Sequence, residues 1–323
     1  MEARRLVPVL ALAIVSVLAA GDPTARAAPR PAGVAEDLIV HEWGTFTTRA
    51  AADGTTVTWN PLAVPTDLPT FVYQNKRTPK RSIQGTVRME TPVLYFYSGR
   101  RQTVSVDVGF PNGTITEWYP RVRHAAHGVR WPAVTLLPGA SPRLKRQRDD
   151  SHYYPARETD AVILRTRLAG VTQFEKFLFY RGVGTFALPV TAGRTGDDVV
   201  VRNGGADPIG RVLVFENRGG SIGHRGGDLT ADQVTIARPV PAAGALDAFR
   251  AELRTLLVAG GLYEREADAM LETWKSTWAE EGLRVFYVLP RSATDAVLPL
   301  TITPAPADVV RVLVGRVELL DPS

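Results

Sequence analysis

The sequence predicts a mainly β protein, built as an antiparallel sandwich or from barrel-like sheets, with a C-terminal α-helical hairpin packed on a sheet. Three observations support this fold class. Residues 38–237 contain many short runs rich in Val, Ile, Thr and aromatic residues, separated by Gly, Pro, Asn and Asp. Helical spacing begins only near residue 245, in two amphipathic segments. The composition, 45% hydrophobic and 22% charged over 323 residues, is typical of a folded globular chain.

The first 27 residues have the pattern of a secretory signal peptide. Arg4 and Arg5 precede an apolar run over residues 6–20, and small residues at 25 and 27 form a cleavage pattern. The run is short for a membrane span, so we expect no transmembrane segment in the mature chain. Because the sequence has no cysteine, the mature protein has no disulfide and must be stabilised by its hydrophobic core. It is predicted to be exported, either to the periplasm or as a secreted protein.

The β-rich region is expected to span residues 28–240. Its strands are predicted from β-branched and aromatic runs bounded by turn residues. They are expected near residues 38–43, 55–59, 86–97, 103–110, 114–119, 133–137, 161–166, 174–181, 197–202 and 210–216.

Residues 241–323 begin with a helical period. Apolar residues recur at helical spacing over 246–257, and Gly260 and Gly261 end this first helix. A second apolar stripe covers 267–278, and Gly282 ends this second helix. Further strands are predicted at 283–289, 298–302 and 309–320. The Pro- and Ala-rich stretch 238–244 is the best candidate for a domain boundary, and the segment after it could also belong to the same domain.

A carboxylate is predicted on an apolar strand face at residue 117. Asn112 and Gly113 lie between two alternating runs, which is a strong signal for a β-hairpin. In such a hairpin Val108 opposes Glu117, which would then share the apolar face with Ile115. An isolated buried charge is costly, so Glu117 should pair with a cation or a metal, carry a proton, or lie at the rim of the sheet.

The predicted strand at 174–181 carries charges on two apolar faces. Alternation places Glu175 and Arg181 on one face with two phenylalanines, and Lys176 on the other face. A strand buried between two layers shows this pattern, and its charges need hydrogen-bonded ion pairs. Other strand-like runs supply candidate partners, namely Glu42, Glu90, Arg157, Glu158, Asp160, Arg165 and Glu216. Two interpretations stay open: paired charges that fix strand register, or a ligand or catalytic site that includes Glu117, Glu175 and Arg181.

The five histidines limit where a metal could bind. His41 and Glu42 are neighbours on a strand and should point to opposite faces, so they cannot easily hold one ion. His124 and His127 would align if their segment formed a helical turn, and His152 could join them from the following loop. These three are the candidate metal ligands, with surface or hydrogen-bonded histidines as the alternative.

Motifs for other cofactors and for nucleophilic catalysis are weak. Residues 219–223 match G-x-S-x-G, but no helix signal follows them, so an ordinary Gly-rich turn is predicted. The sequence has no phosphate-binding loop and no strand-linked dinucleotide motif, so nucleotide cofactors are not expected.

Two basic clusters, at residues 76–81 and 143–148, could contact an anionic envelope component or a membrane surface. Asp149 and Asp150 directly follow the second cluster and partly neutralise it, so a solvated loop is the alternative. Export makes nucleic acid an unexpected partner, and the sequence leaves the oligomeric state open.

Four segments of the chain are rich in aromatic residues and carry a family resemblance: VHEWGTFT at 40–47, METPVLYFY at 89–97, ITEWYP at 115–120 and FLFYRGVG at 177–184. In these segments the chain resembles an uncharacterised group of exported bacterial proteins that carry a His-Glu-Trp-Gly-Thr-Phe-Thr segment. The resemblance covers nearly the whole mature chain. It implies an envelope or secreted setting, and no assigned activity, cofactor or catalytic residue.

Two functions from different classes follow from these observations. The first is a non-catalytic, β-rich binding or scaffolding protein of the bacterial envelope, which fits the strand density and the lack of a catalytic motif. The second is an exported carboxylate- or metal-dependent hydrolase that acts on a saccharide or peptide polymer, which the inward-pointing Glu117 and Glu175 would serve.

Overall fold

The computed structural model describes residues 34–62, 68–75, 83–125, 127–147 and 151–321. This part of the chain is mainly β, as predicted, and contains three sheets and three α-helices. The predicted signal peptide lies outside the described residues. Within those residues, no helix has the length and apolar character needed to cross a membrane.

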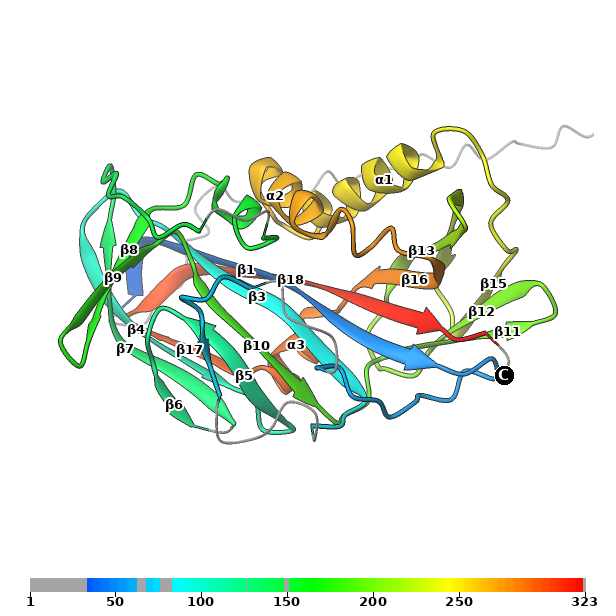
Figure 1. Ribbon diagram of the computed structural model, residues 1–323, viewed down its shortest axis with the longest axis horizontal. Coiled ribbons are helices and arrows are strands. Elements are labelled where there is room, and N and C mark those ends of the chain that lie inside the picture. Colours follow the sequence, from blue (N-terminus) through cyan, green and yellow to red (C-terminus); the bar gives the residue numbers. More distant parts are fainter. Residues whose placement is uncertain (1–33, 63–67, 76–82, 126, 148–150, 322–323) are drawn as a thin grey trace, which may run out of the picture. The chain divides into compact units, whose positions relative to one another are not determined.

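The largest sheet contains nine strands. They are β1 (Val34–Ala50), β2 (Tyr73–Gln74), β3 (Val87–Tyr97), β5 (Gly113–Tyr119), β10 (Leu178–Gly184), β13 (Gly210–Arg218), β14 (Ser221–Leu229), β16 (Gly282–Val288) and β18 (Ala305–Leu319). Their order is β14-β13-β16-β18-β1-β3-β10-β5-β2 (Figure 1). The pair β1–β18 is parallel, whereas the other pairs of this sheet are antiparallel. The predicted antiparallel pairing is therefore wrong at the centre of this sheet. Strands from both sides of residue 240 form this one sheet.

A six-stranded and a three-stranded sheet complete the β structure. The six-stranded sheet contains β4 (Gln102–Gly109), β6 (Arg123–Ala125), β7 (Gly128–Leu137), β8 (Ile163–Leu168), β9 (Val171–Glu175) and β17 (Leu300–Thr303). The three-stranded sheet contains β11 (Val190–Thr195), β12 (Asp198–Asn203) and β15 (Gln233–Ile236). The helices are α1 (Ala245–Ala259), α2 (Glu264–Trp274) and α3 (Arg291–Val297), and a short 3-10 helix η2 spans Pro155–Arg157. The predicted strand at 55–59 is absent as a strand, and only isolated bridges occur there.

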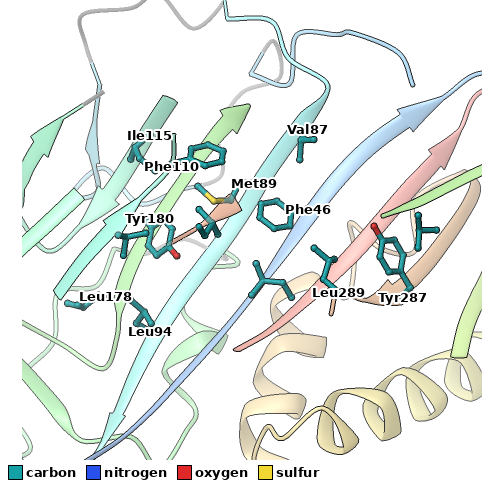
Figure 2. Packing of buried hydrophobic residues seen from close by; sticks show 14 of the residues in the cluster. Phe46, Val87, Met89, Leu94, Phe110, Ile115, Leu178, Tyr180, Tyr287 and Leu289 are labelled. Carbon is teal, nitrogen blue, oxygen red and sulfur yellow. The ribbon is translucent and has the colours of Figure 1, made fainter. Parts of the chain in front are cut away.

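The nine-stranded sheet is buried on both faces. One face packs against the six-stranded sheet in a core that includes Phe46, Met89 and Tyr180 (Figure 2). The opposite face lies under α1 and α2, which contribute Phe249 and Trp274 to a second core. Helix α1 therefore buries the apolar stripe that the sequence predicted, while α2 ends at Trp274, before the last residue of the predicted stripe and before the predicted stop at Gly282. In the following turn Trp278 is still 3% exposed, because it packs in the same core.

The hairpin predicted around Asn112 and Gly113 is wrong. Strand β4 pairs with β7 and β17, whereas β5 pairs with β10 and β2, so the two strands lie in different sheets. A register shift where β5 pairs with β10 makes Thr116 an extra residue in the ladder. The bulge turns Glu117 to the helix-covered face with Tyr119, while Ile115 stays on the other face.

The predicted strand at 174–181 is two strands, β9 and β10, that belong to different sheets. The chain leaves one sheet at Lys176 and enters the other at Leu178. The predicted faces of the second part are confirmed, since Phe179 lies under the helices and Tyr180 lies between the sheets. All seven residues of β10 are buried, as expected for a strand between two layers.

The G-x-S-x-G match at 219–223 is a β-hairpin turn. Gly219 and Gly220 have positive φ angles of 54° and 89° and connect β13 to β14. Ser221 begins a strand and no helix follows it, so this segment is not a nucleophile elbow.

Candidate functional site

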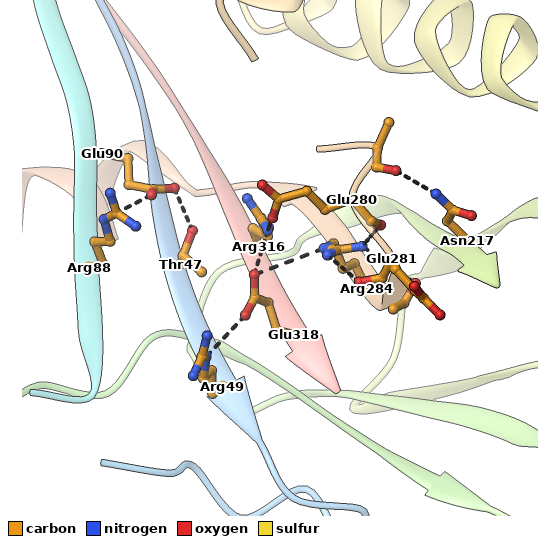
Figure 3. Close-up of polar contacts among 12 residues, drawn as sticks. Thr47, Arg49, Arg88, Glu90, Asn217, Glu280, Glu281, Arg284, Arg316 and Glu318 are labelled. Atoms are coloured by element: carbon orange, nitrogen blue, oxygen red, sulfur yellow. Dashed lines mark hydrogen bonds and ion pairs between the residues drawn. The ribbon is translucent and has the colours of Figure 1, made fainter. Parts of the chain in front are cut away.

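A band of charged and polar side chains crosses six neighbouring strands on the helix-covered face of the nine-stranded sheet. Figure 3 shows its part on β3, β1, β18 and β16. We call it the polar band and define it by Glu117 on β5, Arg181 on β10, Arg88 and Glu90 on β3, Thr47 and Arg49 on β1, Arg316 and Glu318 on β18, and Arg284 on β16. Along each strand these residues continue the face that carries the aromatic core under α1 and α2. The band therefore replaces an apolar core beyond the end of α2.

The β5–β10–β3 end of the band contains two ion pairs. Arg181 Nε lies 3.6 Å from Glu117 Oε2, and the two residues are register partners. Arg88 Nε lies 2.9 Å from Glu90 Oε1, and Thr47 donates a hydrogen bond to Glu90 Oε2 at 2.9 Å. Glu117 and Glu90 are 0% and 3% exposed, so both carboxylates depend on these partners.

The β1–β18–β16 end is richer in arginine. Glu318 accepts from Arg316 and from Arg49 Nε, the latter at 3.1 Å. Arg284 donates to backbone carbonyls of the loop after α2, including that of Glu281 at 2.8 Å. Burial and the nearby charge of Arg316 lower the pKa of Arg284 to about 10. The band as defined holds five arginines and three glutamates, so it carries surplus positive charge.

A cavity of about 220 Å³ opens onto the β3–β10 part of the band. Its lining includes Arg88, Glu90 and Thr91 from β3, Arg181 from β10, Tyr153 from the loop before η2 and Trp274 at the end of α2. His152 and Glu280 complete the charged and titratable part of the wall. The cavity thus combines buried guanidinium and carboxylate groups, which can orient a polar ligand, with two aromatic side chains.

Backbone irregularities shape the cavity wall. Thr91 has a φ angle of 42°, an unusual left-handed conformation for a β-branched residue that costs about 1–3 kcal/mol. It lies where the pairing of β1 with β3 shifts register between Trp43 and Thr45. Gly44 allows this shift, because a Cβ atom there would lie 2.9 Å from Pro92 Cα. Residues 40–47 and 89–97, two of the four segments that carry the resemblance to exported bacterial proteins, therefore meet at this irregularity.

Two polar side chains of the cavity lining have no hydrogen-bond partner in the described part of the chain. The Thr91 hydroxyl and the Trp274 indole nitrogen are both buried and unpaired. Buried donors without partners are rare and costly in folded proteins. Both therefore mark this wall as a place where a polar group would be accommodated favourably.

Of the three residues predicted to act together, the structure keeps Glu117 and Arg181 side by side and places Glu175 apart. Arg181 lines the cavity, and Glu117 lies fully buried as its ion-pair partner. Glu175 is fully buried in another cluster, where Arg157 donates two hydrogen bonds at 2.9 and 2.6 Å and Tyr153 donates one at 3.1 Å. Burial raises the pKa of Glu175, and the hydrogen bonds from Arg157 and Tyr153 oppose that rise. The two carboxylates are thus held in separate arginine pairs.

The three predicted metal ligands do not form the predicted arrangement. The backbone of His124 lies in strand β6, so its segment is not the helical turn that would align it with His127. His127 Nδ1 lies 2.6 Å from the carbonyl oxygen of Gly113, and His152 Nδ1 lies 2.8 Å from that of Thr273. Among the described residues, no group of three or more His, Asp or Glu side chains is placed to hold a metal ion. His152 instead lines the cavity.

Other buried charges serve packing. Glu42 accepts from Arg311 and from Tyr180 between the two large sheets. His41, on the opposite face as predicted, lies 2.7 Å from Glu266 of α2. The contacts of Glu42 therefore connect β1 to β18 and β10 within the sheet, and His41 connects β1 to the helical layer.

The basic clusters are described only in part. Residues 76–81 lie outside the described residues, as do 148–150. Arg143, Lys145 and Arg146 are exposed, and the Arg146 guanidinium lies 4.8 Å from the centre of the Tyr154 ring. One basic patch is therefore available to solvent.

Glu90 gives the band a measurable pH dependence. Burial raises its pKa, but the charges of Arg88, Arg316 and Arg181 outweigh burial, so the pKa of Glu90 lies below its ordinary value of 4.5. As the pH falls, the unfolded chain therefore takes up this proton first. The stability that Glu90 contributes is complete above about pH 4.5 and is lost as the pH falls through the folded pKa.

We therefore expect the stability difference between the wild type and Glu90→Gln to shrink as the pH falls from about 6 to about 3. Urea unfolding at a series of pH values measures this difference, with Glu281→Gln, an exposed carboxylate, as the control. A difference that stays constant or grows on acidification would show that Glu90 is not held ionised by the arginines.

Sequence reasoning identified Arg181 and His152 but assigned them to different sites. It missed Arg88, Tyr153, Trp274 and Glu280, and it considered Glu90 only as an ion-pair partner. The charge at Glu90 within the segment METPVLYFY was the available signal, because it interrupts an apolar strand two residues before Pro92. Comparison with known proteins adds no assignment, since no family model matches the chain and no curated protein matches it.

Proposed function

We propose that the chain is an exported, non-catalytic binding protein of the bacterial envelope that holds an anionic group in the cavity beside Arg88 and Arg181. The observation that carries this proposal is that two guanidinium groups of the polar band, those of Arg88 and Arg181, line the same cavity. Guanidinium groups bind carboxylate and phosphate through paired, charge-assisted hydrogen bonds. The N-terminal sequence pattern and the resemblance to exported proteins support the proposed location.

We further propose that α1 and α2 act as one helical hairpin on the outside of a two-sheet sandwich. Their connection is only four residues long, and both helices contribute to one core with the nine-stranded sheet. This hairpin holds Trp274 and the loop with Glu280 against the cavity.

Hydrolysis remains the second proposal, and the geometry favours it less. A pair of catalytic carboxylates must reach the substrate and each other across a defined gap. Glu117 and Glu175 are both 0% exposed, and each is paired with its own arginine. Their positions support a structural role, and the cavity supports binding.

Small anions should stabilise the mature protein. We expect at least one of inorganic phosphate, acetate, succinate and glutamate to raise the melting temperature in a concentration-dependent way, because ligand binding to the native state stabilises it. Arg88→Gln should abolish the shift, whereas Arg167→Gln, an exposed arginine on β8, should retain it. Thermal denaturation followed by fluorescence measures the effect. No shift with any anion, or an equal shift in Arg88→Gln, would refute anion binding at this cavity.

A further inference from the structure

The cavity presents carboxylates as well as guanidinium groups. Glu90 lies at the buried side of the wall with Arg88 and Arg181, all within the lining of the same cavity. Arg88 Nε contacts one of its oxygens, and the Thr47 hydroxyl donates to the other. Because a carboxylate accepts up to about four hydrogen bonds, Glu90 retains acceptor capacity for a ligand.

Glu280 adds a second carboxylate at the more exposed side. Its side chain is 60% exposed and its Oε2 lies 3.9 Å from Arg316 Nη2. A ligand with only negative charge would therefore meet one carboxylate at the base of the cavity and another toward solvent. The two carboxylates weaken the binding of such a ligand without preventing it, whereas a cationic group beside the anionic group would add an ion pair with Glu90.

The volume favours a small ligand. At about 220 Å³ the cavity lies below the range of about 300–1,000 Å³ that is common for drug-sized molecules. Tyr153 and Trp274 provide apolar wall beside the charged groups. The volume and the lining together suit a small ligand that carries one positive and one negative charge close together and a short side chain.

We infer that the cavity binds a free α-amino acid, with its α-carboxylate on Arg88 and Arg181, its ammonium group on Glu90 and its side chain toward Tyr153 and Trp274. This inference rests on the proposed anion-binding function and specifies its ligand class. Both charges of the ligand contribute, so removal of either charge should weaken binding.

The test uses the native mature protein and a series of matched ligands. The twenty common L-amino acids are first screened by thermal shift, and the best is measured by isothermal titration calorimetry. We expect its N-acetyl derivative, which lacks the ammonium, and its amide, which lacks the carboxylate, each to bind at least about tenfold more weakly. Inorganic phosphate and acetate serve as the anion-only probes.

Two variants assign the charges to residues. Glu90→Gln should weaken binding of the free amino acid by about tenfold or more, while leaving the affinity for its N-acetyl derivative unchanged or increased. If that variant does not fold, Glu280→Gln, at a largely exposed side chain, is the substitute. It should weaken binding of the free amino acid by a smaller factor and leave the affinity for the N-acetyl derivative unchanged. Arg167→Gln should leave both affinities unchanged.

The outcomes separate this inference from the function on which it rests. If N-acetyl derivatives, acetate or phosphate bind as tightly as free amino acids, anion binding stands and the amino-acid ligand is refuted. If neither anions nor amino acids bind, both proposals are refuted.

Discussion

Replacing Arg311 with methionine is expected to lower the free energy of unfolding by about 3–5 kcal/mol. Arg311 is fully buried between the two large sheets, where its Nε lies 2.5 Å from Glu42 Oε2. Its Nη1 also donates to Asp295 of α3 and to the carbonyl of Leu298, both at 2.7 Å. Burial alone would lower the pKa of Arg311, but the charge of Glu42 outweighs it and raises the pKa. The substitution leaves Glu42 in the core without its main cation, and urea unfolding followed by tryptophan fluorescence measures the loss.

A double variant separates the buried charge from the lost packing. Glu42→Leu together with Arg311→Met buries no charge at this position, so it should be more stable than Arg311→Met alone by about 1 kcal/mol or more. Arg130→Met, at an exposed arginine on β7, is the matched control and should change stability by less than about 0.5 kcal/mol. A loss in Arg311→Met no larger than that of this control would show that the pair does not stabilise the layers.

Arg157→Met is the second substitution with a large expected effect, a loss of about 3 kcal/mol or more in unfolding free energy. Arg157 approaches Glu175 with two nitrogens, and Tyr153 donates to the same carboxylate. Burial works to lower the pKa of Arg157, yet the hydrogen bonds and charge of Glu175 raise it. Without Arg157 the fully buried carboxylate of Glu175 must take up a proton or reach water. Urea unfolding at pH 5 and pH 8 measures the loss, which should be larger at the higher pH because protonation relieves it.

The same cluster decides between the two proposed functions. Glu175→Gln is expected to lower the melting temperature, because it removes the charge that Arg157 holds. A hydrolase would show the opposite pattern, an unchanged melting temperature with lost turnover on a saccharide or peptide polymer. That second result would overturn the binding proposal. Arg265→Gln, in an exposed ion pair with Asp160, is the control that neither function affects.

Local structure could be predicted from the sequence wherever one strand or helix carried its own signal. The alternation in residues 177–181 predicted which side chains of β10 face each layer. It did so because this strand is regular and both of its faces are buried, so the two-residue period of a strand decides the face of each side chain. The apolar stripe at 246–257 predicted α1 for the same reason. Strand β14 was missed because Gly223, Gly226 and Gly227 remove the side-chain pattern that identifies a strand.

Strand partners could not be predicted, because they depend on contacts between distant segments. The Asn112-Gly113 signal predicted a hairpin, yet β4 pairs with β7 and β5 pairs with β10, in separate sheets. The face of Glu117 was wrong for a related reason, since a single extra residue in the ladder reverses the side-chain alternation. No local pattern encodes a bulge that the neighbouring strand imposes.

The candidate site shows the same limit. Charges at Arg181 and Glu90 were visible as interruptions of apolar strands, so the sequence identified part of the wall. The cavity itself requires α2 and the loop at 151–153 to lie over β3 and β10, which only tertiary packing determines. His152 was therefore assigned to a metal site rather than to this wall.

The parallel pairing of β1 with β18 has a consequence for how the protein acquires its fold. These two strands sit side by side at the middle of the nine-stranded sheet, yet Glu42 and Arg311 within them are 269 positions apart in the chain. Strands β13, β14 and β16 reach the rest of the sheet only through β18. Closing so long a loop is entropically slow, so we expect folding to await synthesis of the final strand, and ribosome-bound chains that stop before residue 305 to remain sensitive to protease.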